Sequence, residues 1–261
     1  MAKIELKNEF RPFAPNLILI PGGPGLGPVS FGPLATLIKN INVFFYYPTG
    51  TYGDHADKLI SYEEQIEELK IEVENLDNVY LCGHSFGGIQ AVDLALRISP
   101  RVKGIICIAS PFSSEAFKEV ERNGSKNKTL EQIKMDDVFV NDPSNENYKR
   151  WFASYAHLYF SSSNVVQGHN MLLDDSVNVK NYLGARAAAA LKEQLLMEIK
   201  KSSIRRLFVT GEKDRLLPVE ILREESSLGG FMFKVIKDAG HFVHFDQAEN
   251  TSALIEEFVI N

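Results

Sequence analysis

The chain has 261 residues, of which 44% are hydrophobic and 24% charged, and its formal net charge is −6. This composition is typical of a globular protein and predicts one large domain, with room for an inserted subdomain. It offers no basic cluster for a nucleic acid and no apolar run of membrane-span length, and the opening MAKIELKNEF lacks the apolar core of a signal peptide. We therefore expect a cytoplasmic protein without a nucleic-acid partner or membrane span. The sequence leaves its oligomeric state open.

Short apolar runs rich in β-branched and aromatic residues predict the strands. These runs are continuous rather than alternating, which is typical of strands buried on both faces of a parallel sheet. Cys82 and Cys107 fall inside two of the runs, so we expect buried, reduced thiols rather than a disulfide or metal ligands. The predicted strands cover residues 17–20, 42–47, 78–82, 102–109, 205–210 and 231–236.

Helical patterns lie between the strands. Ser61 and Glu64 form a capping box, and apolar residues then recur at helical spacing up to Leu76. Residues 86–98 and 248–260 predict two further helices. Alternation of strands and helices predicts an α/β fold with a mostly parallel central sheet, flanked by helices and joined by right-handed crossovers.

One segment interrupts this alternation. Residues 111–203 contain no convincing strand, and the stretch ARAAAALKEQLLMEIKK (185–201) predicts a long helix. We therefore predict a core formed by residues 1–110 and 204–261, with 111–203 as a helical cap subdomain. The segment also holds an aromatic cluster, which more often forms a subdomain core than the wall of a substrate site: Tyr148, Trp151, Phe152, Tyr155, Tyr159 and Phe160.

The stretch Gly83-His84-Ser85-Phe86-Gly87 connects a predicted strand directly to a predicted helix. A G-x-S-x-G turn in this context is tight and presents its serine oxygen beside the free N–H groups of the helix N-terminus. We predict that Ser85 is a nucleophile. The alternative is a serine that merely caps the helix, which would not require glycines on both sides.

A serine nucleophile needs a base, and the base needs an orienting carboxylate. Asp214 follows the strand at 205–210 and His241 follows the strand at 231–236, which is the chain order of such partners in this fold class. Asp214 is favoured because a turn and a proline follow it, and His241 because Gly240 precedes it. The competing candidates are Glu212, Asp238 and His244.

The loop Pro21-Gly22-Gly23-Pro24-Gly25 follows the first core strand. A serine attack on a carbonyl generates an oxyanion, which needs preorganised N–H donors. One predicted donor is Phe86, directly after the nucleophile, and the other is Gly23, because Pro24 has no N–H. A phosphate-binding loop is excluded because no Lys-Ser or Lys-Thr follows the glycines.

With these residues in place, the chain resembles the α/β-hydrolase superfamily, through PGGPG, GHSFGG, GEKD and GH in that order. Within it, the chain is similar to the proline iminopeptidase-like group, whose oxyanion loop reads His-Gly-Gly-Pro-Gly and which carries a helical cap after the strand seen here in PRVKGIICIASPF. The resemblance implies an enzyme that removes N-terminal residues, with cap carboxylates holding the substrate's amino group. Candidates for that role are Glu115, Glu119, Asp136, Asp137 and Glu146, each of which is also compatible with a solvated surface position.

The chain departs from that group in three places. Pro21 replaces the histidine, residues 47–54 read YPTGTYGD in place of Asp-x-Arg-Gly-x-Gly-x-Ser, and only about sixteen residues precede the first core strand. We predict a serine hydrolase without cofactor or metal that acts on an ester or amide of a small molecule or short peptide through an acyl-enzyme. Aminopeptidase, carboxylesterase or lipase, carbon–carbon hydrolase and acyltransferase activities stay open, as does a binding or signalling module with little turnover.

Overall fold

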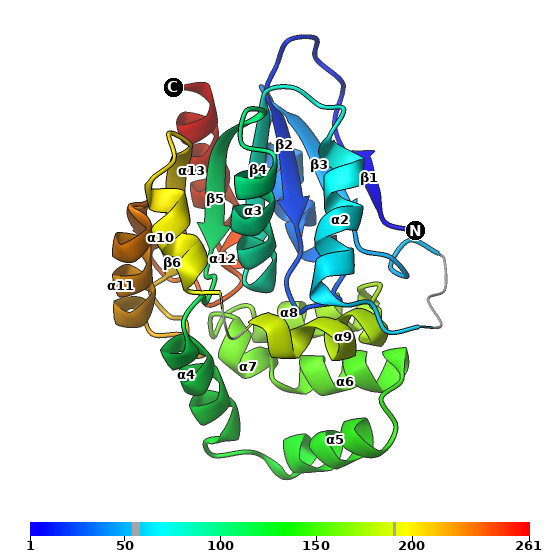
Figure 1. Cartoon of the computed structure of the whole chain (residues 1–261). Coiled ribbons are helices and arrows are strands. Elements are labelled where there is room, and N and C mark those ends of the chain that lie inside the picture. Colours follow the sequence, from blue (N-terminus) through cyan, green and yellow to red (C-terminus); the bar gives the residue numbers. More distant parts are fainter. Residues whose placement is uncertain (54–57, 190–191) are drawn as a thin grey trace.

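The computed structural model describes residues 1–53, 58–189 and 192–261, so Asp54 lies outside the described residues. Within them, one sheet of seven strands has the order β1-β3-β2-β4-β5-β6-β7 (Figure 1). All six predicted strands are present, and β1 is added at the edge as a short strand antiparallel to β3, whereas the other pairs are parallel. The strands are β1 Lys3–Leu6, β2 Asn16–Ile20, β3 Asn42–Tyr47, β4 Val79–His84, β5 Val102–Ile108, β6 Arg205–Gly211 and β7 Met232–Ile236.

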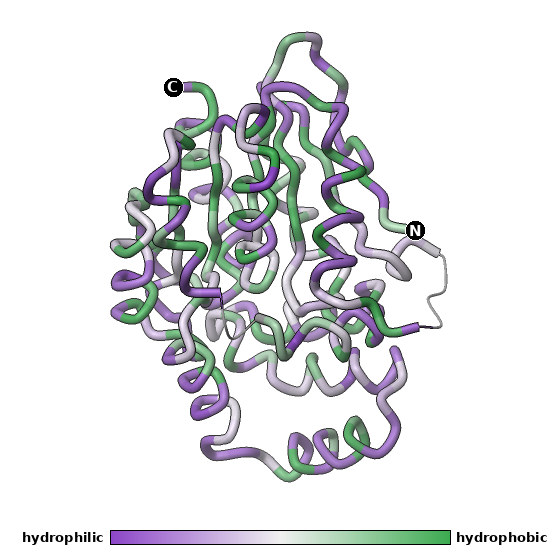
Figure 2. The backbone as a smooth tube through the Cα atoms, in the orientation of Figure 1, coloured by the Kyte–Doolittle hydropathy of each residue, from purple (hydrophilic) through white to green (hydrophobic). Residues whose placement is uncertain are grey.

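The central strands are buried on both faces, as their continuous apolar runs predict. In β2, Leu17 and Leu19 belong to the apolar cluster on one face, and Ile18 and Ile20 belong to the cluster on the other. The backbone coloured by hydropathy shows this as long hydrophobic stretches along the middle strands (Figure 2). Each fully buried residue of this size contributes roughly 1.5–3 kcal/mol of transfer free energy, so these strands anchor the fold.

Helices cover both faces of the sheet. On one face, α1 (Gly32–Leu37) packs against α12 (Val243–Asp246) and α13 (Ala248–Ile260). On the other face, α3 packs against its neighbours α2 and α10, and α10 packs against α11. These four helices are α2 Tyr62–Val73, α3 Phe86–Arg97, α10 Gln194–Lys200 and α11 Val219–Gly229.

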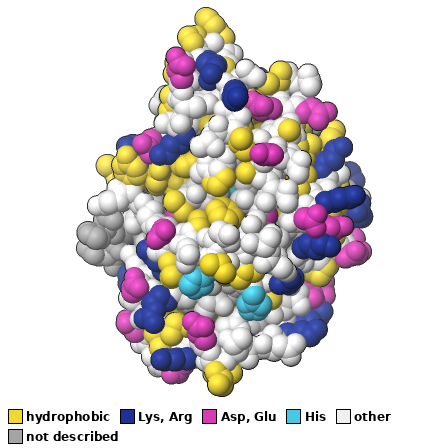
Figure 3. Space-filling model, turned by 180° about the vertical axis from the view of Figure 1, so that it is seen from behind, with side chains coloured by type: hydrophobic (Ala, Val, Ile, Leu, Met, Phe, Trp, Pro, Cys, Tyr) yellow, Lys and Arg dark blue, Asp and Glu magenta, His cyan; other side chains and the backbone are white. Residues whose placement is uncertain are grey.

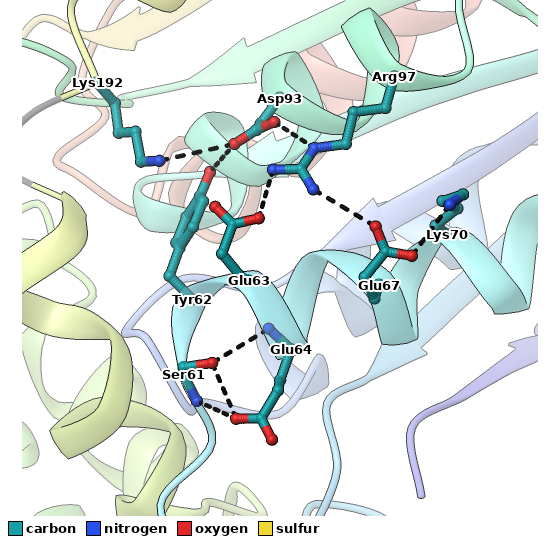
Figure 4. A network of polar contacts seen from close by, with 9 residues as sticks. All are labelled: Ser61, Tyr62, Glu63, Glu64, Glu67, Lys70, Asp93, Arg97 and Lys192. Carbon is teal, nitrogen blue, oxygen red and sulfur yellow. Dashed lines mark hydrogen bonds and ion pairs between the residues drawn. The ribbon is translucent and has the colours of Figure 1, made fainter.

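The predicted capping box begins α2. The Ser61 hydroxyl accepts from the Glu64 backbone N–H, and the Glu64 carboxylate accepts from the Ser61 backbone N–H. The first turn of α2 is tied to α3 by Arg97, which binds Glu63 at 2.8 Å and the buried Asp93 at 2.8 Å (Figure 4). Asp93 also accepts from the Tyr62 hydroxyl at 2.8 Å. These contacts hold α2 and α3 together.

Helices fill the segment between β5 and β6, and Figure 1 shows α5 to α9 gathered beyond the carboxyl ends of the strands. The last helix before β6, α10, packs instead against α3 and α11 on the face of the sheet. The helices that we call the helical insertion are α4 Ser114–Ser125, α5 Leu130–Asn141, α6 Asn145–Ser154, α7 Ala156–Tyr159, α8 Val165–Asp174 and α9 Val179–Ala189.

The prediction of one long helix over 185–201 is wrong. Helix α9 ends at Ala189, α10 begins at Gln194, and Lys192 and Glu193 between them are not helical, while residues 190–191 lie outside the described residues. Tertiary contacts act at this junction, because the Lys192 ammonium lies 3.8 Å from the Asp93 carboxylate and 4.0 Å from the centre of the Tyr62 ring (Figure 4). They bring the chain back from the helical insertion to the sheet.

The expectation for the two cysteines is confirmed. Cys82 and Cys107 are both buried and unbridged. Acidic and basic side chains are interspersed on the face seen from behind (Figure 3). Across the part of the chain that the structure describes, no helix is both long and apolar enough to cross a membrane.

Candidate active site

Ser85 lies at the sharp turn between β4 and α3. Its φ of 51° and ψ of −119° fall in a region that residues with side chains rarely adopt, at a typical cost of about 1–3 kcal/mol. Gly83 is required on one side, because a Cβ there would collide with the backbone of Gly87. The Ser85 side chain does not cap α3, so the reading of this serine as a simple helix cap is wrong.

Asp214 and His241 come from two different loops at the carboxyl edge of the sheet and meet side by side. His241 Nδ1 lies 2.9 Å from Asp214 Oδ2, and the two side chains are 3% and 0% exposed. The other carboxylate oxygen of Asp214 accepts the backbone N–H groups of Leu216 and Leu217, each at 2.9 Å. Since both oxygens have donors, the carboxylate is fixed in an orientation that holds the imidazole.

None of the competing candidates occupies this position. Glu212 pairs with Lys213 at 3.3 Å, and among the described residues neither Glu212 nor Asp238 makes a hydrogen bond or ion pair with His241, whereas Asp214 does. His244 is fully buried, and its Nε2 lies 3.0 Å from the Ser30 hydroxyl rather than near a carboxylate. The structure therefore brings Asp214 to His241.

Sequence reasoning missed two residues that hold the loop bearing His241. His84 Nε2 lies 3.2 Å from the His241 carbonyl oxygen, and because that oxygen only accepts, Nε2 carries the hydrogen. Asp246 accepts the backbone N–H of Gly240 and that of Ser161, each at 2.7 Å. The position of His84 directly before Ser85 was a usable signal, whereas nothing in the sequence marked Asp246.

His84 and His244 pack on each other and are neutral at ordinary pH. Their ring centres are 4.7 Å apart. Burial lowers the pKa of His244 to about 3, and burial together with the neighbouring histidines holds the pKa of His84 well below its usual value. His84 and His244 therefore add no positive charge beside His241.

Ser85 and His241 line a single cavity of about 570 Å³. Gly23 and Phe86, the two predicted oxyanion donors, line the same cavity. The structure thus brings four of the five predicted site residues to one cavity, and it places the fifth, Asp214, behind His241.

The wall of this cavity comes largely from the helical insertion. Phe117 of α4, Trp151 and Phe152 of α6, Tyr159 of α7 and Tyr182 of α9 line it. Trp151 also stacks on Phe139 with ring centres 4.8 Å apart. Of the predicted aromatic cluster, Trp151, Phe152 and Tyr159 thus line the cavity, whereas the other three members lie in the core of the helical insertion. The sequence favoured the core role for the whole cluster.

Among the residues that the structure describes, Glu121 of α4 and Arg186 of α9 are the charged side chains that line the cavity. The five acidic residues that the sequence offered as partners for a substrate amino group are not among the described residues that line this cavity. Asp136 is instead occupied by Lys128, Trp151 and Tyr155 through contacts of 2.6–2.8 Å. Among the residues described, no group of three or more His, Cys, Asp or Glu side chains is arranged to hold a metal.

Comparison with known proteins places this geometry in context. Residues 5–254 match the alpha/beta hydrolase family. The chain is 36% identical over 116 residues to a proline iminopeptidase of Saccharolobus solfataricus, an alignment that covers 41% of this chain and only 37% of that relative's length. It is 24% identical to the (R)-3-hydroxydecanoyl-ACP:CoA transacylase of Pseudomonas putida, over 99% of this chain and 91% of the relative.

The fold is also found among solved structures. A thermophilic esterase from Thermogutta terrifontis superimposes with a TM-score of 0.72 at 16% identity, covering 99% of this chain and 93% of the esterase. At that identity the likeness concerns the fold alone.

Proposed function

This chain belongs to the alpha/beta hydrolase family, and we propose that it is a serine hydrolase that cleaves an ester or amide bond of a small substrate through an acyl-enzyme. The observation that carries the proposal is the joint arrangement at the cavity. Ser85 lies on a strained turn, and it lines the same cavity as His241. The Nδ1 atom of His241 is 2.9 Å from the Asp214 carboxylate. A serine on a strained turn that opens to a cavity, together with an oriented imidazole, is the arrangement that nucleophilic catalysis requires.

In the proposed reaction, His241 accepts the proton of Ser85 as the serine oxygen attacks the substrate carbonyl carbon. The negative charge that develops on the carbonyl oxygen is stabilised by the backbone N–H groups of Gly23 and Phe86. Asp214 keeps His241 in the tautomer with hydrogen on Nδ1 and stabilises the imidazolium. His241 then protonates the leaving group, and afterwards it activates the water that hydrolyses the acyl-enzyme.

We further propose that the helical insertion, within residues 111–203, acts as the cap that selects the substrate. Its aromatic side chains supply most of the apolar wall, which suits an apolar acyl group or side chain. Among the described residues, the only charged side chains of the cavity lining are Glu121 and Arg186. A substrate that carries several charges would therefore find few partners there.

The test is hydrolysis of p-nitrophenyl esters of increasing chain length and of prolyl and alanyl arylamides by the purified protein. We expect ester turnover in the wild type and a loss of about 10⁴-fold or more in kcat for Ser85→Ala. Ser227→Ala, which changes an exposed serine of α11, is the matched control and should keep full activity. A serine-directed phosphonate should label Ser85. Absence of both turnover and label would exclude the enzyme and favour a binding module.

An aminopeptidase is the second candidate. It is favoured by the identity with a proline iminopeptidase over part of the chain and by Glu121, an acid that lines the cavity. If this function is the correct one, the prolyl arylamide is hydrolysed well above the esters, and Glu121→Gln raises its KM without affecting the esters. Ester turnover alone, abolished in Ser85→Ala, would discard the aminopeptidase.

A further inference from the structure

A tyrosine of the helical insertion contacts the glycine-rich loop of the core. The hydroxyl of Tyr148, in α6, donates to the carbonyl oxygen of Pro24 at 2.6 Å. Tyr148 has no exposed surface, so this hydrogen bond is shielded from water. The same hydroxyl lies against Gly23, because a Cβ placed there would be 3.2 Å from it. Tyr148 therefore contacts both Pro24 and Gly23, the proposed oxyanion donor.

The connection between α8 and α9 of the helical insertion holds the next residues of the loop. The backbone N–H of Asn178 donates to the Gly25 carbonyl at 2.8 Å, and Leu26 forms an antiparallel bridge with Val177. Gly25 has a φ of +89°, and a Cβ there would collide with the Asn178 carbonyl oxygen. Residues 24–26 are thus attached to the helical insertion at consecutive positions, although they belong to the core in sequence.

Tyr148 does not line the substrate cavity, but its neighbours do. Its ring centre is 5.0 Å from that of Tyr182 and 6.0 Å from those of Trp151 and Phe152, all three of which line the cavity. Tyr148 lies behind this wall and reaches past it to the loop. Its hydroxyl has a role in the fold that the aromatic stacking of the cluster does not explain.

We infer that Tyr148 is a positioning residue that holds the N–H of Gly23 in the geometry required to bind the oxyanion. This inference rests on the proposed function and deepens it, because it makes the oxyanion hole depend on the helical insertion. A hydrogen bond that fixes the peptide beside the donor matters most when charge develops on the substrate oxygen. Loss of the hydroxyl should therefore affect the transition state more than the bound substrate.

The experiment compares Tyr148→Phe with Tyr155→Phe in ester hydrolysis. Tyr155 is the matched control, since it belongs to the same aromatic cluster and its hydroxyl also makes a short hydrogen bond, 2.7 Å to Asp136, away from the loop. For Tyr148→Phe we expect kcat to fall by about 10- to 100-fold with KM within about twofold, less than the loss of a whole oxyanion donor. Tyr155→Phe should change both constants by less than about twofold.

A second readout separates positioning from a purely structural role. A boronic acid forms a tetrahedral adduct with an active-site serine and places an oxygen where the oxyanion develops. Its inhibition constant should rise in Tyr148→Phe by the same factor as kcat falls. Equal kcat in Tyr148→Phe and the wild type, or a loss that appears in KM and equally in Tyr155→Phe, would overturn the inference while leaving the proposed function intact. A wild type that shows neither turnover nor phosphonate labelling of Ser85 would overturn both.

A size-matched pair at position 148 keeps the test decisive if the phenylalanine variant does not fold. Replacement by p-aminophenylalanine retains a donor at the ring end, and replacement by p-methylphenylalanine fills the space without one. The inference requires the amino variant to keep most of the wild-type kcat and the methyl variant to lose it. Equal kcat in the two variants would overturn it.

Discussion

The sheet core holds Ser85 and His241, whereas the helical insertion supplies most of the aromatic wall of the same cavity, and the two regions are built from different contacts. In the core, the decisive interactions are short and specific to backbone or carboxylate, such as the 2.9 Å contacts of Asp214. In the helical insertion, rings such as Phe139 and Trp151 meet at centre distances of 4.8 Å and above. The site in the core depends on where single polar atoms lie, whereas the wall from the helical insertion depends on the packing of apolar surface.

Because of this difference, we expect substitutions in the core to affect the turnover of all substrates alike, and substitutions in the helical insertion to affect turnover according to substrate size. A change of one atom at the core site alters charge or tautomer and affects every substrate. A change of one ring in the helical insertion alters apolar area and affects substrates according to their size. Tyr148 and Glu225 are exceptions, because each links the two regions through hydrogen bonds.

Among the changes that compare the two regions, the largest effect is expected for Asp214→Asn. The Asn oxygen can still accept the Leu216 and Leu217 N–H groups, but its NH₂ group would face His241 Nδ1 and favour the wrong tautomer. We expect kcat to fall by about 10⁴-fold for every substrate, with the fold preserved. Steady-state kinetics on two esters of different size measures this. Glu212→Gln is the control and should retain activity, and an equal loss there would show that the core site is assigned to the wrong acid.

An intermediate effect is expected at Glu225, where the two regions join. This buried carboxylate of α11 accepts the backbone N–H of Ser113 at 2.6 Å and that of Phe112 at 3.1 Å, where the chain leaves β5 for the helical insertion. Burial raises the pKa of Glu225 to about 7 from its usual 4.5. Between those values the folded protein retains a proton that the unfolded chain has released, so this group favours folding below pH 4.5 and the contribution is lost as pH rises through 7.

The measurement is urea unfolding of the wild type and of Glu225→Gln between pH 5 and pH 8. The side chain at position 225 carries no charge in the variant. The free energy of unfolding of the wild type should therefore fall relative to that of the variant by about 2.5 kcal/mol between pH 5 and pH 8, at about 1.4 kcal/mol for each pKa unit. Other groups titrate equally in both proteins and cancel in the difference. Parallel stability curves would show that Glu225 does not retain its proton in the folded protein.

The smallest expected effect is at the wall. Phe152 lines the cavity and stacks on Tyr159 with ring centres 4.8 Å apart. In Phe152→Ala we expect KM for a long-chain ester to rise by about 10-fold, which corresponds to about 1.4 kcal/mol of apolar contact, and KM for the acetyl ester to change by less than about twofold. Phe10→Ala, at an exposed phenylalanine, serves as the control. An equal rise for both esters would place Phe152 with the residues of the core, which affect all substrates alike.

Local pattern was sufficient for most of the core. Continuous apolar runs predicted six strands, the capping box at Ser61 predicted the start of α2, and the G-x-S-x-G turn predicted the strand-to-helix junction at Ser85. Each of these signals lies within a few residues of the feature that it predicts. The predicted helix over 185–201 failed for the same reason, since its local propensity was high and the contacts of Lys192 with Asp93 and Tyr62 are distant in sequence.

By itself, the sequence determined the fold class and the residue types that chemistry at this site requires, because both follow from periodicity and from motifs whose parts are close together. Only the tertiary structure decided which acid meets His241, that His244 bonds to Ser30, and that Tyr148 reaches Pro24 across 124 positions of the chain. Those pairings depend on how loops from separate strands converge at one edge of the sheet and on how the helical insertion folds over it. Distances of this kind are set by packing, and the order of residues along the chain does not contain them.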